Sequence, residues 1–278
     1  TFTNKASREM KERLESLLRI SSQGLWFGTF HGICRRILKI HWKEAELSER
    51  FTILDSQDQL RLIKRIIKTN NLDDKLYDAK SIQSFINRKK DNGLRSNKAS
   101  EKDDEVYVLV YKEYESILKQ THSVDFADLI LKTYELFTEN KNILSYYAKR
   151  FKHIMVDEFQ DTNLLQFKLL KILNNSTGSM YAVGDDDQSI YGWRGALSKN
   201  IKNYTDQFVD VEIFKLEQNY RSTDKILSVA NSLITHNKNR LGKELWTNSS
   251  RGDSVKIFEA YNNDEESAFI IDKIKTLE

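Results

Sequence analysis

The chain has 278 residues, of which 39% are hydrophobic and 31% are charged, and its formal net charge is only +3. This length allows about two domains with a sizeable buried core, whereas so weak a net charge does not by itself indicate nucleic-acid binding. The sequence has no apolar run of about 18 residues and no signal peptide, and its single cysteine, Cys34, excludes an internal disulfide, so we expect a cytoplasmic protein without a membrane partner.

The first fifty residues predict short strands and helices with a basic bias. Residues 1–3 read as the tail of a strand, and residues 25–30 as a short strand. Apolar residues at helical spacing predict a helix over 6–18, and residues 33–42 read as a basic helix. Lys and Arg outnumber Asp and Glu by ten to six in residues 1–50.

Between about residues 47 and 147 the apolar spacing indicates helices with no intervening strand. A run of helices between strand-bearing segments suggests a helical insertion into an α/β domain. The predicted helices span residues 55–68, 80–90, 105–119, 126–137 and 143–150.

The α/β pattern resumes at Phe151. Residues 154–161 read Ile-Met-Val-Asp-Glu-Phe-Gln-Asp, an apolar strand that ends in two carboxylates. A second strand and acid cluster follow at residues 180–187, and residues 164–173 between them have helical spacing. Open α/β sheets place their chemistry beyond the carboxyl ends of the strands. This order outlines a nucleotide-hydrolysing core.

The last part of the chain predicts a strand at residues 211–216, a helix at 224–237, a strand at 255–260 and an amphipathic helix at 264–277. The strand predicted at residues 1–3 has no beginning, and the helix predicted at 264–277 has no cap. We therefore expect the chain to be an internal piece of a longer protein.

Asp157 and Glu158 are the candidate hydrolytic acids. The first carboxylate of such a pair typically holds Mg²⁺, and the second is placed to polarise an attacking water. An isolated Asp-Glu is more often a solvated turn, but the residues that follow, 159–163, argue against that alternative.

The glycine-containing loop 184–196 offers groups for two ligands. Gln188 could sense a terminal phosphate, and Arg194 adds a cation. Tyr191 and Trp193 could stack on bases, which contributes about 1–3 kcal/mol each, although they could equally fill a core. An extended chain covers at most about 17 Å from Gln188 to Trp193, so one loop could contact a nucleotide phosphate and a base.

Tyr220 and Arg221 stand between a predicted strand and a predicted helix. The Arg221 guanidinium matches phosphate oxygens, and Tyr220 could stack on a purine. The alternative is a surface cation near a helix start, where the helix dipole disfavours it.

Weaker candidates for phosphate or base contact are polar or aromatic residues at strand ends and helix starts. His31 taken alone is more often a hydrogen-bonded core histidine. These candidates are Phe2, Thr3, Asn4, Thr29, His31 and Phe126.

Together these segments resemble the UvrD/Rep/PcrA family of superfamily 1A DNA helicases. Residues 1–6, 28–31 and 125–129 are similar to its motifs Ia, Ib and Ic. Residues 156–163 match motif II, 183–196 match motif III and 216–222 match motif IV. The resemblance covers essentially the whole chain.

The resemblance implies that the cofactors are ATP and Mg²⁺. Asp157 would bind Mg²⁺, Glu158 would be the general base, Gln188 and Arg221 would contact the γ-phosphate, and Tyr220 would stack on adenine. The same resemblance implies a single-strand path. Its residues would be Phe2, Thr3, Asn4, Thr29, His31, Phe126, Tyr191, Trp193 and Arg194.

The implied fold class is α/β: a partial RecA-like P-loop NTPase core with a parallel sheet and an inserted all-helical subdomain. Residues 1–30 would belong to lobe 1A, 31–150 to the helical insertion 1B, 151–217 to the remainder of lobe 1A, and 218–278 to the start of lobe 2A. The family's phosphate-binding Gly-Lys-Ser/Thr loop would lie upstream of Thr1.

The implied function is an ATP-dependent 3′→5′ DNA helicase of repair and replication. Its partners would be single-stranded DNA, single/double-strand junctions and DNA-repair proteins. We expect the 278-residue piece alone to hydrolyse ATP negligibly. Two alternatives remain: a non-catalytic DNA-binding or partner-docking module, and a subunit of a helicase–nuclease.

Overall fold

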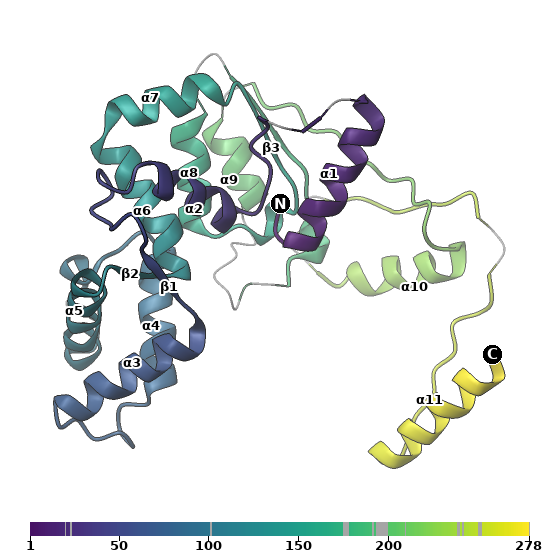
Figure 1. The fold of residues 1–278 in the computed structure, drawn as a ribbon. Coiled ribbons are helices and arrows are strands. Elements are labelled where there is room, and N and C mark those ends of the chain that lie inside the picture. Colours follow the sequence, from purple (N-terminus) through teal and green to yellow (C-terminus); the bar gives the residue numbers. More distant parts are fainter. Residues whose placement is uncertain are drawn as a thin grey trace. The chain divides into compact units, whose positions relative to one another are not determined.

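The computed structural model describes all residues except 20, 23, 101, 175–177, 191, 193–199, 209, 238–239, 241, 250–251 and 278, and it leaves the side chains of 200–203 undescribed. The chain divides into two compact units, Thr1–Val209 and Asp210–Glu278 (Figure 1). Within the described residues, no helix is both long and apolar enough to cross a membrane.

The helices predicted in the first unit are confirmed, most of them to within two residues at each end. Several begin at a Thr or Asp whose side-chain oxygen accepts a backbone N–H of the first turn, which is the usual way to start a helix. They are α1 (Asn4–Leu18), α2 (Phe30–Ile40), α3 (Ser56–Thr69), α4 (Ala79–Asp91), α5 (Glu105–Gln120), α6 (Phe126–Glu139), α7 (Lys141–Arg150) and α8 (Leu164–Leu173). A further helix, α9 (Asn200–Gln207), was not predicted from the sequence.

The strands predicted at residues 1–3 and 25–30 are wrong. The structure shows no strand in either segment. Instead Thr3 and Thr29 have extended backbones and cap α1 and α2. Both segments have β-prone sequences, but their threonines are the N-caps of the helices that follow. As a result, α2 begins three residues earlier than predicted.

The insertion is not purely helical. β1 (Thr52–Leu54) and β2 (Ser123–Asp125) pair in parallel, and Figure 1 shows them beside α3 and α5. Val124 on β2 is fully buried. One apolar core joins α3, α4 and α5, and another joins α2, α6, α7 and α8. The helices of residues 30–150 therefore pack against α8 through α4, α6 and α7.

The predicted parallel pairing is confirmed for two strands. β3 (His153–Val156) and β4 (Ser179–Ala182) run parallel, with α8 as the connection between them. α8 packs Phe167 and Leu170 with Val156 and Phe159. Because the strands are parallel, the segments that follow them meet at the same edge.

In the second unit, α10 (Asp224–Ile234) and α11 (Asn263–Leu277) confirm the predicted helices, although α10 ends three residues early. The strands predicted at 211–216 and 255–260 are wrong. Residues such as Leu216 and Ile257 are largely exposed. The isolated bridge described in this unit joins Gln218 and Trp246, which lie outside both segments. A β-prone segment needs a partner to satisfy its backbone groups.

Candidate functional site

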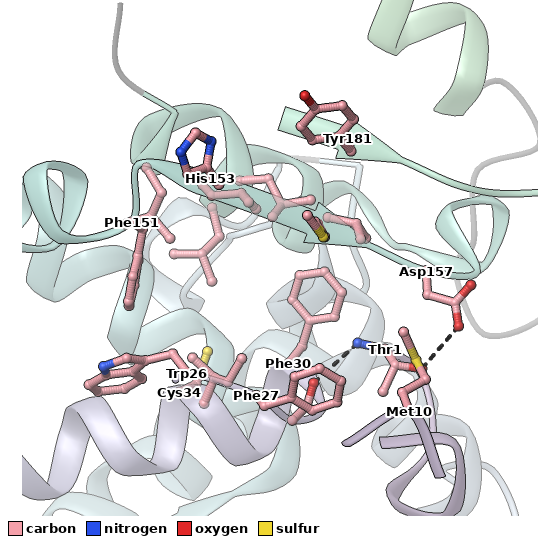
Figure 2. A pocket seen from close by; sticks show the side chains of 18 of the residues that line it. Thr1, Met10, Trp26, Phe27, Phe30, Cys34, Phe151, His153, Asp157 and Tyr181 are labelled. Carbon is pink, nitrogen blue, oxygen red and sulfur yellow. Dashed lines mark hydrogen bonds between the residues drawn. The ribbon is translucent and has the colours of Figure 1, made fainter. Parts of the chain in front are cut away.

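Asp157 and Glu158 follow directly after β3. Glu158 has φ 52° and ψ 45°, a left-handed conformation that residues with a side chain rarely adopt. Such a conformation persists where the surrounding structure fixes it. Asp157 is half-buried and accepts a hydrogen bond from Thr1 Oγ1 at 3.4 Å (Figure 2). The turn at Glu158 ends the strand and leaves two carboxylates at the carboxyl end of β3. Together, the carboxyl ends of β3 and β4 are called the sheet edge.

Gln160 ties the acid pair to the end of the neighbouring strand. Its amide nitrogen donates to the Glu158 carboxylate at 2.7 Å, and its amide oxygen accepts the backbone N–H of Asp185 at 3.0 Å. Gln160 is buried, so both ends of its amide need such partners. A Cβ on Gly184 would lie 2.7 Å from Gln160 Oε1, which leaves room only for glycine. Sequence reasoning missed Gln160, although a glycine directly before the acid cluster signals a close approach.

Gln188 joins the same edge through a chain of hydrogen bonds. Its amide donates to the Asp185 carboxylate at 2.8 Å, and Asp185 donates its backbone N–H to Gln160, which in turn holds Glu158. Gln188 is exposed, so a ligand can reach it. The structure therefore brings Glu158 and Gln188 into one hydrogen-bonded arrangement at the ends of two parallel strands.

The edge is rich in carboxylates. Oxygens of Asp185, Asp186 and Asp187 lie within 4.8 Å of one another. Burial, and then the charge of Glu158, raise the pKa of Asp161, and Asp161 Oδ1 is buried without a hydrogen-bond partner among the described residues. An oxygen-rich, negatively charged edge fits a hard divalent cation such as Mg²⁺, which prefers carboxylate ligands.

His31 and Phe126, far apart in the sequence, lie together. Their ring centroids are 5.9 Å apart at 70°, an edge-to-face contact. Phe126 begins α6 and is 54% exposed. Thr29, which caps α2 by accepting the Gly32 N–H at 3.2 Å, lies two residues before His31. Burial lowers the pKa of His31, which favours its neutral form.

The start of the chain lies beside the Thr29 segment. The Thr1 amino group donates to the Gly28 carbonyl at 3.1 Å. Thr3 accepts the Ala6 N–H at 3.1 Å, and Asn4, the first residue of α1, is exposed. Phe2 is half-buried. The predicted motif Ia and Ib residues therefore meet, and Thr1 also connects them to Asp157.

A cavity of about 500 Å³ is bordered by residues of α2, β3 and α8 and reaches Asp157. Figure 2 shows Trp26 and Phe30 on one side, with Phe151 and Tyr181 on the other. These walls are largely apolar, whereas phosphates require hydrogen-bond donors or cations. The cavity itself is therefore not a triphosphate site. Phosphates would instead approach Asp157 from the side where Asp185 and Gln188 lie.

Tyr220 and Arg221 belong to the second unit. Asn219 Oδ1 accepts the backbone N–H groups of Arg221 and Ser222 at 2.9 and 2.8 Å, which fixes a turn before α10. Tyr220 is 86% exposed and donates its hydroxyl to Gln218 Oε1 at 2.7 Å. The turn presents both side chains to solvent. Tyr191, Trp193 and Arg194 lie outside the described residues.

Sequence reasoning also missed a buried ionic cluster in the insertion. Lys90 is fully buried and donates to Asp125 and Asp128 at 2.6 and 2.7 Å. Arg95 donates to Asp128 at 2.6 Å and forms a two-pronged pair with Glu135. The sequence offered one signal: two acids three residues apart, Asp125 and Asp128, are the pattern of a capping box.

A buried cluster of this kind shifts the acidity of its members. Burial alone would raise the pKa of Asp128, but Lys90 and Arg95 outweigh it and hold that pKa far below its ordinary value. The neighbouring Asp91 has no ion pair with a cation in the part of the chain that the structure describes. Burial, and then the charge of Asp125, raise its pKa to about 6.

Parallel strands that end in an acid pair and a glutamine, packed against helices, are typical of α/β nucleotide-binding proteins. The chain belongs to the UvrD/REP helicase family. The UvrD/REP helicase N-terminal domain matches residues 1–209, and the UvrD-like helicase C-terminal domain matches residues 214–278.

Individual relatives are similar over nearly the whole chain. DNA helicase II of Escherichia coli (strain K12) is 46% identical over 99% of this chain and 39% of its own length. A probable DNA helicase II homolog of Rickettsia conorii is 44% identical over 100% and 43%, and the ATP-dependent DNA helicase PcrA of Staphylococcus epidermidis is 39% identical over 99% and 38%. The chain thus spans about two fifths of the length of the curated relatives it matches.

Proposed function

We propose that the chain is part of an ATP-dependent DNA helicase that moves 3′→5′ on single-stranded DNA and acts in repair and replication in the cytoplasm. The hydrogen-bond chain from Glu158 through Gln160 and Asp185 to Gln188 carries this proposal. It gives the chain a preorganised group of acid and amide side chains where parallel strands end. Relatives whose names state DNA helicase activity support the same conclusion.

For hydrolysis, each residue of the edge has a proposed role. Asp157 would hold Mg²⁺, which when bound supplies charge neutralisation of the phosphates. Glu158 would accept a proton from the attacking water. Gln160 orients that carboxylate through its 2.7 Å hydrogen bond. Gln188 would contact the terminal phosphate.

Arg221 and Tyr220, in the second unit, have proposed roles toward ATP. An arginine contact stabilises charge that develops on the γ-phosphate, and the exposed Tyr220 ring is free to stack on adenine. The proposal also includes the domain boundaries predicted from the sequence: residues 1–30 and 151–217 for lobe 1A, 31–150 for insertion 1B, and 218–278 for the start of lobe 2A.

For DNA, we propose a path over three adjoining segments: Phe2, Thr3 and Asn4; Thr29 and His31; and Phe126. The contacts of Thr1 with Gly28 and of His31 with Phe126 support it, since they connect these segments in one unit. Tyr191, Trp193 and Arg194 would complete the path. The partners would be single-stranded DNA, strand junctions and repair proteins.

Unwinding of tailed duplexes by the full-length protein tests the function directly. We expect ATP-dependent strand displacement when the duplex carries a 3′ single-stranded tail, and at least tenfold slower displacement with a 5′ tail of equal length. The measurement is the rate of release of a fluorescent strand, with a non-hydrolysable ATP analogue as the control. Preference for the 5′ tail would contradict the direction, and tight DNA binding without any hydrolysis would favour a non-catalytic module.

Replacing Phe126 by Ala should weaken binding of the 278-residue chain to labelled oligo(dT) by about 5- to 150-fold, since a stacked base contributes about 1–3 kcal/mol. The measurement is fluorescence anisotropy at fixed salt concentration. Tyr146→Ala is a matched control: Tyr146 is 55% exposed and has an edge-to-face contact with Tyr147 at 5.1 Å, but it lies on α7. Equal loss in both variants, or no loss in Phe126→Ala, would contradict the proposed path.

A further inference from the structure

The last two residues of α4 contact two different parts of the molecule. Successive side chains on a helix point about 100° apart. Lys90 therefore reaches the start of α6, where it donates to Asp125 and Asp128. Asp91 instead accepts the Asn163 side-chain N–H at 2.8 Å, at the start of α8. One helix end is thus bonded to the beginnings of two other helices.

Lys90 fixes the segment that carries Phe126. Asp125 caps α6 and Asp128 is its third residue, and each side chain accepts the backbone N–H of the other, at 2.8 and 3.4 Å. Lys90 binds both of these carboxylates, and Tyr114 donates its hydroxyl to Asp125 at 2.8 Å. Phe126 stands between the two acids as the first residue of α6, so its position relative to His31 depends on this arrangement.

Asp91 fixes the segment that follows the acid pair. Asn163 caps α8, and it and Gln166 accept each other's backbone N–H at 2.9 and 3.0 Å. A single 3₁₀ turn, Phe159–Asp161, separates this cap from Glu158. Lys168 donates to the Asn92 carbonyl at 3.3 Å, which provides a second contact between the end of α4 and α8. Movement of the α4 end would therefore move the start of α8, and with it the turn that holds Gln160.

We propose that Lys90 and Asp91 are positioning residues that couple the His31–Phe126 pair to the Glu158 carboxylate, a role that rests on the proposed function. A strand that displaces Phe126 would shift the α6 start, the buried Lys90 would carry that shift to the end of α4, and Asp91 would carry it through Asn163 to the acid pair. Apolar residues of similar volume often stabilise a core as well as a buried ion pair does. These polar contacts instead keep three helix ends in one fixed arrangement.

The test compares DNA-stimulated with basal ATP hydrolysis in the full-length protein. Asp91→Ala removes the acceptor for Asn163, and Asn163→Ser removes the donor while a serine oxygen still caps α8. For each variant we expect the stimulation by saturating oligo(dT) to fall at least tenfold. We expect the basal rate and the oligo(dT) affinity to change less than threefold. Asp91→Asn keeps an oxygen acceptor and should restore stimulation to within threefold of the wild type.

Asp103→Ala is the matched control. Asp103 pairs with Lys89, the residue before Lys90 on α4, at 2.6 Å, and this ion pair includes no residue of α6 or α8. This variant should retain wild-type stimulation. The double variant Asp91→Ala with Asn163→Ser should lose no more stimulation than either single variant, because both remove the same bond.

Two results would overturn the coupling role. One is wild-type stimulation in both Asp91→Ala and Asn163→Ser; the other is an equal fall of basal and stimulated rates, which indicates a purely structural role. If Asp91→Ala fails to fold, as judged by circular dichroism, Asn163→Ser decides alone. Absence of DNA stimulation in the wild type would instead count against the proposed function itself.

Discussion

Replacing Glu158 by Gln in the full-length protein should lower the rate of ATP hydrolysis by at least about 100-fold, because a positioned general base contributes about 10²- to 10⁴-fold. Binding of ATP should persist. Gln is nearly isosteric with Glu, and its amide oxygen can still accept the bond from Gln160, so the turn after β3 should keep its shape. The measurements are steady-state phosphate release and equilibrium binding of a fluorescent ATP analogue.

Glu139→Gln is a suitable control, because Glu139 is exposed at the end of α6. It should hydrolyse ATP at the wild-type rate. Retained hydrolysis in Glu158→Gln would place the base elsewhere. Loss of nucleotide binding together with hydrolysis would show that Glu158 holds the fold or the metal rather than the water.

Replacing Lys90 by Met should lower the free energy of unfolding of the first unit by about 3–5 kcal/mol. Removing one member of a buried ion pair leaves uncompensated charge in the core, and here two carboxylates, Asp125 and Asp128, would lose their shared cation. A typical domain is stable by only 5–15 kcal/mol, so a large part of its stability would be lost. The measurement is urea denaturation followed by tryptophan fluorescence.

Two further variants identify the cause of that loss. Lys64→Met, at an exposed position on α3, should change stability by less than about 0.5 kcal/mol. Adding Asp125→Asn to Lys90→Met should recover part of the loss, since it removes the carboxylate that loses its cation, whereas Asp128 still pairs with Arg95. A Lys90→Met protein as stable as the wild type would show that water or a rearrangement already compensates these carboxylates.

The same cluster predicts a pH dependence. The pKa of Asp128 is depressed in the folded protein by Lys90 and Arg95. The contribution of Asp128 to the free energy of unfolding is therefore complete above its unfolded pKa of about 4, and it is lost as the pH falls further. The difference in the free energy of unfolding between the wild type and Lys90→Met should accordingly become smaller on acidification below pH 4. An unchanged difference down to pH 2 would contradict the ion-pair explanation.

Local patterns in the sequence predicted most helices and the acid pair. Helical spacing of apolar residues marks α3 to α8 because an amphipathic helix shows its buried face directly in the sequence. An apolar run that ends in Asp157 and Glu158 marked the end of β3, and the same pattern marked β4. These features depend on residues close together in the chain, so they could be read without coordinates.

The tertiary structure alone decided which distant groups meet. Residues 25–30 and 211–216 have β-prone sequences, but a strand forms only where another strand accepts its backbone hydrogen bonds, and the described structure provides no such partner. Likewise the contact of His31 with Phe126, the bridge of Gln160 to Asp185 and the burial of Lys90 arise from the packing of separate helices. The sequence therefore determined the elements and their chemical groups, whereas the packing of their apolar faces determined which groups came within bonding distance.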